Sequence, residues 1–184
     1  MHLKMKPVYF FLLLTLLVGC GGNVILDNPG DSVATFEFDR GDGYEVPAGE
    51  MQEISLDPGS HQVVIKSGGE VVADTTFNLK EGGIVHSGQS TYVVWKQLYG
   101  LQNDRKTLLN EKWVEFDSVK TYGDFKVYRP EAVFIEDTWD YGLADDLPDA
   151  QSLYINKDFV VESKVFRSQD FVDTYKDLAA QQPN

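Results

Sequence analysis

The amino-acid sequence predicts a mainly β or α+β protein, in which an N-terminal β-sandwich is followed by a β-rich region with a C-terminal amphipathic helix. Three observations lead to this prediction. Residues 33–95 contain short runs of alternating apolar and polar residues, separated by turn sequences rich in glycine, proline and aspartate. From residue 96 onward the glycines thin out, and tyrosine and tryptophan become common. Near the end of the chain, apolar residues recur at helical spacing.

The predicted sandwich consists of six or seven short strands between residues 33 and 95. Ala34, Phe36 and Phe38 alternate with polar residues and lead into a turn at Arg40–Gly43, which is a hairpin pattern. The segment 82–90 has the composition of a loop. The further predicted strands are 44–46, 52–56, 61–66, 71–79 and 91–95. Strands of this length and spacing favour an all-β sandwich or a small barrel.

The second half is predicted to add more strands and one helix. The predicted strands are 112–122, 125–128, 133–135, and a late hairpin of 153–155 with 159–166. Ser168 is a candidate helix N-cap. The apolar residues that follow it at helical spacing are Phe171, Val172, Tyr175, Leu178 and Ala179. Because this helix is amphipathic, we expect it to dock on the sheet.

Residues 38–65 resemble a known type of repeat. A glycine-turn hairpin is followed by Val46-Pro47, and then by Ile54-Ser55-Leu56-Asp57-Pro58-Gly59-Ser60-His61, which leads into alternating valines. This arrangement is similar to the PEGA-type β-sandwich repeats of bacterial envelope proteins, which place a proline before the strand that ends in a Pro-Gly turn. The resemblance covers roughly a third of the chain. It implies a non-catalytic spacer or binding module and supplies no site residues.

The first nineteen residues have the features of an export leader. Lys4 and Lys6 form a basic region, residues 8–18 are almost entirely apolar, and Leu17-Val18-Gly19 leads directly to Cys20. This arrangement resembles the lipobox of bacterial lipoproteins. A helix over the apolar run would extend roughly 18 Å, well short of the roughly 30 Å hydrocarbon core, which disfavours a transmembrane anchor. The remaining alternative is an ordinary signal peptide that is cleaved before Gly21.

The lipoprotein resemblance implies cleavage before Cys20, a diacylglycerol on its sulfur, and a further acyl group such as palmitate on its new amine. Two or three acyl chains would hold the protein stably at a membrane. Cys20 is the only cysteine, so the fold would have to rest on burial without a disulfide. Gly21 stands where an aspartate tends to retain enterobacterial lipoproteins in the inner membrane. We therefore expect a lipid-anchored protein of the bacterial cell envelope, on the outer membrane and facing the periplasm.

These features divide the chain into four segments: a signal peptide at 1–19, a lipidated tether at 20–32, the sandwich at 33–95 and the α+β region at 96–184. Residues 21–31 contain three glycines, two asparagines and a proline. Such a tether would reach at most about 38 Å from the membrane. Whether the last two segments are two domains or one continuous core is left open by the sequence.

The charge balance excludes some classes of partner. Loss of the leader removes two lysines from the 16 basic residues, so that 14 face 29 acidic ones, a formal balance of −15. This sign argues against nucleic acid and against electrostatic adhesion to anionic lipid. It is compatible with cationic partners, with divalent ions, or simply with solubility.

The segment 131–150 is the most distinctive local feature. It contains seven carboxylates, encloses Trp139 and Tyr141, and has no lysine or arginine. Such a segment can be a solvated acidic loop, a surface for a sugar or a cationic partner, or a calcium loop, although its spacing does not match an EF-hand. The residues that we single out as a candidate ligand or partner surface are Glu136, Asp137, Trp139, Asp140, Tyr141, Asp145 and Asp146.

Two classes of function follow from these observations. The first is a membrane-tethered, non-catalytic module that binds another envelope component, either a protein or a glycan. The second is an envelope glycan hydrolase that uses a carboxylate pair within 131–149. A carbohydrate-binding module with Trp139 or Tyr141 as a stacking platform is a variant of the first. Ser87 beside His86 could be proposed as a nucleophile and base, but a triad also needs an orienting acid and an oxyanion hole that a sequence does not show. We assign no catalytic residue, metal ligand or cofactor.

Overall fold

A computed structural model of the protein describes residues 22–100, 105–148 and 159–175. Within these residues, twelve strands form three four-stranded sheets, and a short helix lies near the C-terminal end. The predicted fold class, mainly β or α+β with a C-terminal helix, is confirmed. Cys20 and the predicted strand at 153–155 lie outside the described residues.

The first sheet, called sheet I, contains the hairpins that the alternating pattern predicted. Its strand order is β3-β2-β5-β6 and all its pairings are antiparallel. Its strands are β2 (Ala34–Phe38), β3 (Gly43–Val46), β5 (Gly59–Ser67) and β6 (Glu70–Leu79). At the turn between β2 and β3, Asp39 and Arg40 have φ angles of 51° and 62°. This left-handed conformation matches the twist of a tight hairpin.

Sheet II packs face to face against sheet I and completes a β-sandwich. Its strand order is β11-β7-β1-β4, and only the β1–β7 pairing is parallel. Its strands are β1 (Gly22–Asp27), β4 (Met51–Leu56), β7 (Gly83–His86) and β11 (Phe134–Glu136). Phe36 and Ile65 of sheet I pack with Leu26 of sheet II in a fully buried core between the two.

Two expectations about this region are wrong. Residues 22–27, expected within the tether, form β1, and residues 83–86, expected in a loop, form β7. Both strands lie in the middle of sheet II, which is covered on both faces: Val24 faces sheet I, whereas Ile25 contributes to the core on the opposite side. A strand that is buried on both faces shows no alternation of polar and apolar residues, so the pattern that revealed sheet I was missing.

Sheet III covers the other face of sheet II. Its strand order is β12-β8-β10-β9, and its pairings are antiparallel. Its strands are β8 (Tyr92–Gly100), β9 (Lys112–Phe116), β10 (Val119–Tyr128) and β12 (Phe159–Arg167). A one-turn helix, α1 (Arg105–Leu108), lies between β8 and β9 in the chain. The single strand expected over 112–122 is instead a hairpin, because Asp117 adopts a φ of 48° and reverses the chain.

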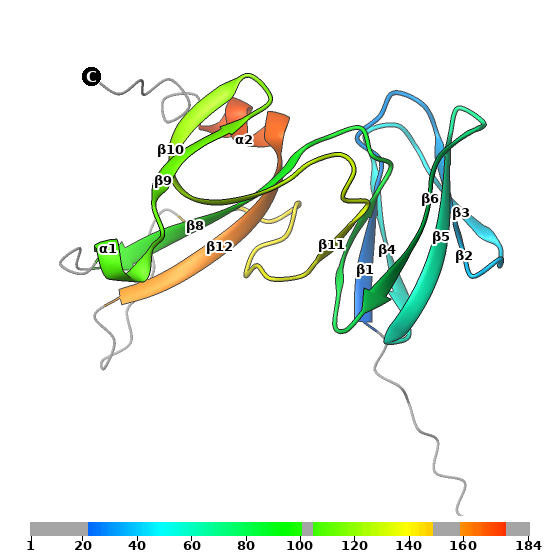
Figure 1. Cartoon of the computed structure of the whole chain (residues 1–184), viewed down its shortest axis with the longest axis horizontal. Helices are drawn as coiled ribbons and strands as arrows, with labels where there is room; N and C mark the ends of the chain where they lie inside the picture. Colours follow the sequence, from blue (N-terminus) through cyan, green and yellow to red (C-terminus); the bar gives the residue numbers. More distant parts are fainter. Residues whose placement is uncertain (1–21, 101–104, 149–158, 176–184) are drawn as a thin grey trace, which may run out of the picture.

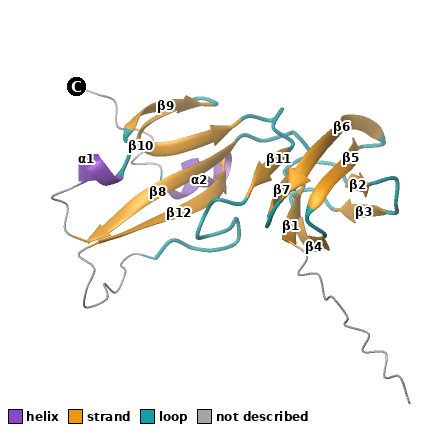
Figure 2. Cartoon of the chain, turned by 60° about the horizontal axis from the view of Figure 1, so that its bottom comes forward, coloured by secondary structure: helices purple, strands orange, loops and turns teal. Residues whose placement is uncertain are grey.

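The C-terminal helix α2 (Ser168–Thr174) packs on sheet III as predicted (Figure 2). Phe171 is fully buried and its ring lies against those of Phe116, Phe125 and Phe166. The N-cap residue is Arg167, without a side-chain capping bond, so the expectation that Ser168 caps the helix is wrong. The backbone N–H of Ser168 instead donates to the carbonyl of Thr91, 2.8 Å away.

The resulting order of layers is sheet I, sheet II, sheet III and α2, with a buried apolar cluster at each interface (Figure 1). The expected boundary at residue 95 falls inside β8, and β11, from the second half of the chain, is an edge strand of sheet II. The two segments expected at 33–95 and 96–184 therefore share strands and cores. None of the helices among the described residues has the length and apolar character needed to cross a membrane.

Candidate functional site

The segment 131–150, here called the acidic segment, includes β11 of sheet II and then reaches the edge of β12 in sheet III at Tyr141. Two of its carboxylates, at and just after the end of β11, have partners within the protein. Glu136 Oε1 accepts a hydrogen bond from the Lys80 ammonium at 2.8 Å, on an exposed part of the surface. Asp137 Oδ1 accepts from the backbone N–H of Trp139 at 3.2 Å. These contacts fix the direction in which the chain leaves sheet II.

Asp140 and Tyr141 attach the segment to β12. Asp140 Oδ2 accepts from both the N–H and the hydroxyl of Ser163, each at 2.8 Å. The backbone N–H of Tyr141 donates to the Ser163 carbonyl at 2.9 Å, and the N–H of Val165 donates to the Tyr141 carbonyl at 3.1 Å. Tyr141 thereby forms an isolated parallel bridge with Lys164. This part of the acidic segment is built into the edge of sheet III.

Trp139 is half-buried and packs against the core between sheets II and III, beside Ile84 and Ile135. A ring in this position supports the contact between the sheets. The two exposed aromatic residues that lie together are on other strands. Trp113 of β9 and Tyr122 of β10 are cross-strand partners with ring centroids 5.4 Å apart, and they are 39% and 52% exposed.

Lys164 contributes to this region without any signal in the local sequence. It is only 5% exposed, yet its ammonium donates to the carbonyl of Gly142 at 2.7 Å and to that of Asp145. The ammonium also lies 4.7 Å from the centre of the Phe166 ring. Desolvation by burial lowers the pKa of Lys164, although the nearby Asp145 and Asp146 act in the opposite direction. The strand pattern around Lys164 does not indicate that its ammonium will bind backbone carbonyls of a loop about twenty residues earlier in the chain.

Lys164, Asp145 and Asp146 border a cavity of about 610 Å³ between the acidic segment and α2. Asp145 Oδ2 accepts from the backbone N–H of Gly142 at 2.6 Å, which tightens the turn beside Lys164. Asp170 of α2 contributes a third carboxylate to the cavity lining. Across residues 22–100, 105–148 and 159–175, there is no group of three or more His, Cys, Asp or Glu side chains placed to hold a metal ion.

The ring nitrogens of His86 and the hydroxyl of Ser87 form hydrogen bonds with different partners. His86 Nε2 lies 2.7 Å from the carbonyl of Ala132, and its Nδ1 accepts from the N–H of Gly88 at 3.1 Å. The Ser87 hydroxyl donates to the side-chain oxygen of Asn28 at 3.2 Å. Both residues are buried, and their hydrogen bonds satisfy polar groups that the fold removes from water.

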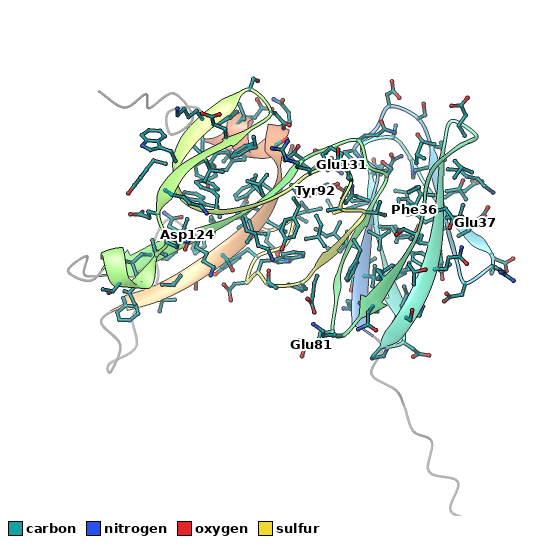
Figure 3. The ribbon with its side chains drawn as sticks, in the orientation of Figure 1. Phe36, Glu37, Glu81, Tyr92, Asp124 and Glu131 are labelled. Atoms are coloured by element: carbon teal, nitrogen blue, oxygen red, sulfur yellow. The ribbon has the colours of Figure 1, made fainter. Side chains whose placement is uncertain are left out.

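A buried ion pair lies where sheets II and III meet, close to His86. Asp27, at the end of β1, is fully buried and accepts hydrogen bonds from the Tyr92 hydroxyl and from two nitrogens of Arg167, of which Nε is 3.0 Å away. The same guanidinium donates to the carbonyl of Gly49 at 3.0 Å. The hydrogen bond that Arg167 donates to Asp27 raises the pKa of Arg167, and burial raises the pKa of Tyr92. Tyr92 lies between the two halves of the molecule in Figure 3.

Comparison of the chain with protein-family models, with curated proteins and with solved structures found no match.

Proposed function

We propose that this chain is a lipid-anchored, non-catalytic lipoprotein of the bacterial cell envelope, which binds or supports another envelope component. The observation that carries the proposal is the leader: two lysines, an apolar run, and Leu17-Val18-Gly19 immediately before Cys20. The expected position on the outer membrane follows from Gly21 and belongs to the same proposal.

The hydrogen bonds that the carboxylates of the acidic segment form within the protein support a non-catalytic role. A glycan hydrolase needs two carboxyl groups that are free to act on substrate. Here Asp140 holds Ser163, Asp145 holds a backbone N–H, and Glu136 pairs with Lys80. These bonds join strands and turns of the protein to one another, which favours an architectural role for the acidic segment.

For the contact with a partner we propose the exposed surface around Trp113 and Tyr122. Large aromatic side chains are enriched at protein interfaces because they bury much area at a low entropy cost. Lys120 lies 5.9 Å from the centre of the Trp113 ring and forms an ion pair with Glu115 at 3.1 Å. Charged groups therefore border the aromatic pair, as in the polar rim of an interface.

The lipid anchor is tested with the native chain and the Cys20→Ser variant, both expressed in a bacterium that acylates lipoproteins. We expect the native chain to incorporate labelled palmitate and to enter the detergent phase, and the variant to do neither. Incorporation by the Cys20→Ser variant, or a native chain that retains its first methionine, would contradict the proposal.

The partner surface is tested by photo-crosslinking in the cell. A photoreactive amino acid at position 122 should give a discrete adduct that disappears when Trp113→Ala is added. The control is position 71, because Val71 is 59% exposed but lies on β6 of sheet I. Equal adducts from both positions, or an adduct that survives Trp113→Ala, would refute this choice of surface.

A further inference from the structure

The first strand fixes the place at which the chain enters the folded protein. Gly22 is buried and pairs with Leu56 in the β1–β4 ladder. A Cβ atom at position 22 would lie 1.9 Å from the backbone oxygen of Glu81, so only glycine fits. The backbone at Gly22 is therefore held between β4 and the turn that precedes β7.

Cys20 is only two residues before Gly22. Even a fully extended chain allows at most about 7 Å between their Cα atoms. This inference rests on the proposed acylation of Cys20. We propose that the end of the sandwich at which β1 begins is the surface that faces the lipid bilayer.

The register of the strands defines the turns that form this surface. Gly22 lies opposite Leu56, at the end of β4, and Val24 lies opposite Gly83, at the start of β7. The turns at 57–58 and 80–82 therefore flank the start of β1. In Figure 3 Glu81 lies at this end of sheet II. We name the described residues 57–58, 80–82 and 137 the membrane-proximal end.

The charge of the membrane-proximal end determines how it meets the bilayer. Asp57, Glu81 and Asp137 are exposed there, whereas the one lysine, Lys80, is paired with Glu136. Adhesion of a protein surface to anionic headgroups requires an excess of lysine and arginine. The acyl chains must therefore supply the attachment, and the adjoining protein surface fits a bilayer with zwitterionic headgroups.

The opposite end of β1 provides a matched control. Glu50 is exposed and its carbonyl accepts from the N–H of Asn28, just beyond the last residue of β1. Five residue steps of a strand separate Gly22 from Asp27, a distance of about 17 Å. Glu81 and Glu50 are thus two exposed glutamates at opposite ends of the same strand.

The experiment places a fluorophore at each end of the lipidated protein. Acylation blocks the only native thiol, so Glu81→Cys and Glu50→Cys each introduce one reactive cysteine. Both labelled proteins are reconstituted in phosphatidylcholine vesicles that contain a nitroxide on the headgroup. We expect the label at 81 to lose most of its fluorescence and the label at 50 to lose little. Lys80→Cys repeats the membrane-proximal measurement one residue away.

Equal quenching at 81 and 50, or stronger quenching at 50, would overturn the proposed orientation while leaving the lipid anchor intact. Flotation with the vesicles reports on the anchor separately. If the native protein does not float, or the Cys20→Ser variant floats as well as the native protein, the proposed function fails and the orientation fails with it.

Discussion

Asp27, a single buried carboxylate, joins three elements that are far apart in the sequence. It lies at the end of β1 and receives hydrogen bonds from Tyr92, 65 positions later, and from Arg167, 140 positions later. No local pattern relates residues so widely separated. The contact is a property of the complete fold, and it ties sheet II to both β8 and β12 of sheet III.

Removal of the positive partner should destabilise the protein strongly. Arg167→Ala removes the cationic partner of the fully buried Asp27, and loss of one partner from a buried pair costs about 3–5 kcal/mol. The free energy of unfolding is measured by urea titration. The control is Lys66→Ala, which breaks a more exposed ion pair with Glu37 and should cost less than about 1 kcal/mol. Similar losses in the two variants would contradict this view of Asp27.

His86 is a second residue whose surroundings affect the stability of the whole protein, in this case through its pKa. Its Nδ1 accepts a hydrogen bond from the Gly88 N–H, so protonation there would place two donors against each other. Burial lowers the pKa of His86, against opposing effects from the Ala132 carbonyl and from Asp27. For His61, desolvation is outweighed by the hydrogen bonds to Asp39 and the Asp57 carbonyl, and the pKa is raised.

These opposite shifts give a predicted pH dependence. Below about pH 6.5 the unfolded chain protonates His86 more readily than the folded protein does, so the free energy of unfolding should fall as the pH falls. Because folding raises the pKa of His61, this residue already contributes its full stabilisation below about pH 6.5. Urea titrations between pH 6.5 and 5 should therefore show a shallower slope for His86→Gln than for the native chain. Parallel slopes would exclude His86 as the source of the acid sensitivity.

At the scale of elements, the sequence predicted strands well where one face meets solvent. Sheet I alternates cleanly, and its hairpins were found. In β7 all four residues are buried, so the sequence shows no alternation there and its composition predicts a loop. The hairpin at Asp117 was missed because an aspartate in a left-handed conformation carries no glycine signal.

The composition of the acidic segment is distinctive in the sequence, but its contacts depend on residues elsewhere in the chain. Asp140 was singled out from the sequence, whereas its partner Ser163 and the buried Lys164 were not. The pairing requires β12 to lie beside residues 140–141, which follows from the sheet order and not from local composition. Composition showed where carboxylates accumulate, and only the fold shows what they bind.

The attachment of this segment to β12 can be tested locally. Asp140→Ala removes the acceptor for two hydrogen bonds from Ser163, each worth about 1 kcal/mol. We expect amide hydrogen exchange at Tyr141 and Val165 to accelerate by roughly thirtyfold, since the two bonds together are worth about 2 kcal/mol and 1.4 kcal/mol corresponds to a factor of ten. Amides in sheet I should be unaffected. Asp146→Asn is the control, and equal acceleration in that variant would show that charge alone, and not the Ser163 bonds, controls the segment.

At the scale of the whole molecule, the two halves of the chain are interlocked. The strand β11 belongs to the second half but extends sheet II of the sandwich, and Arg167 returns from β12 to reach Asp27. Between sheets II and III, Ile84 and Ile135 pack against Tyr92 and Val165 in one apolar cluster. Neither half could bury its share of this cluster alone.

The interlocked arrangement predicts one cooperative unfolding transition. The three tryptophans, Trp95, Trp113 and Trp139, all lie from residue 95 onward, so their fluorescence reports on sheet III and the acidic segment. Far-ultraviolet circular dichroism reports on the strands of all three sheets. Because sheets II and III share a core and a buried ion pair, the two signals should change at the same urea concentration. Two separate midpoints would mean that the sandwich survives without β11, β12 and Arg167, and the chain would then consist of two independent folding units.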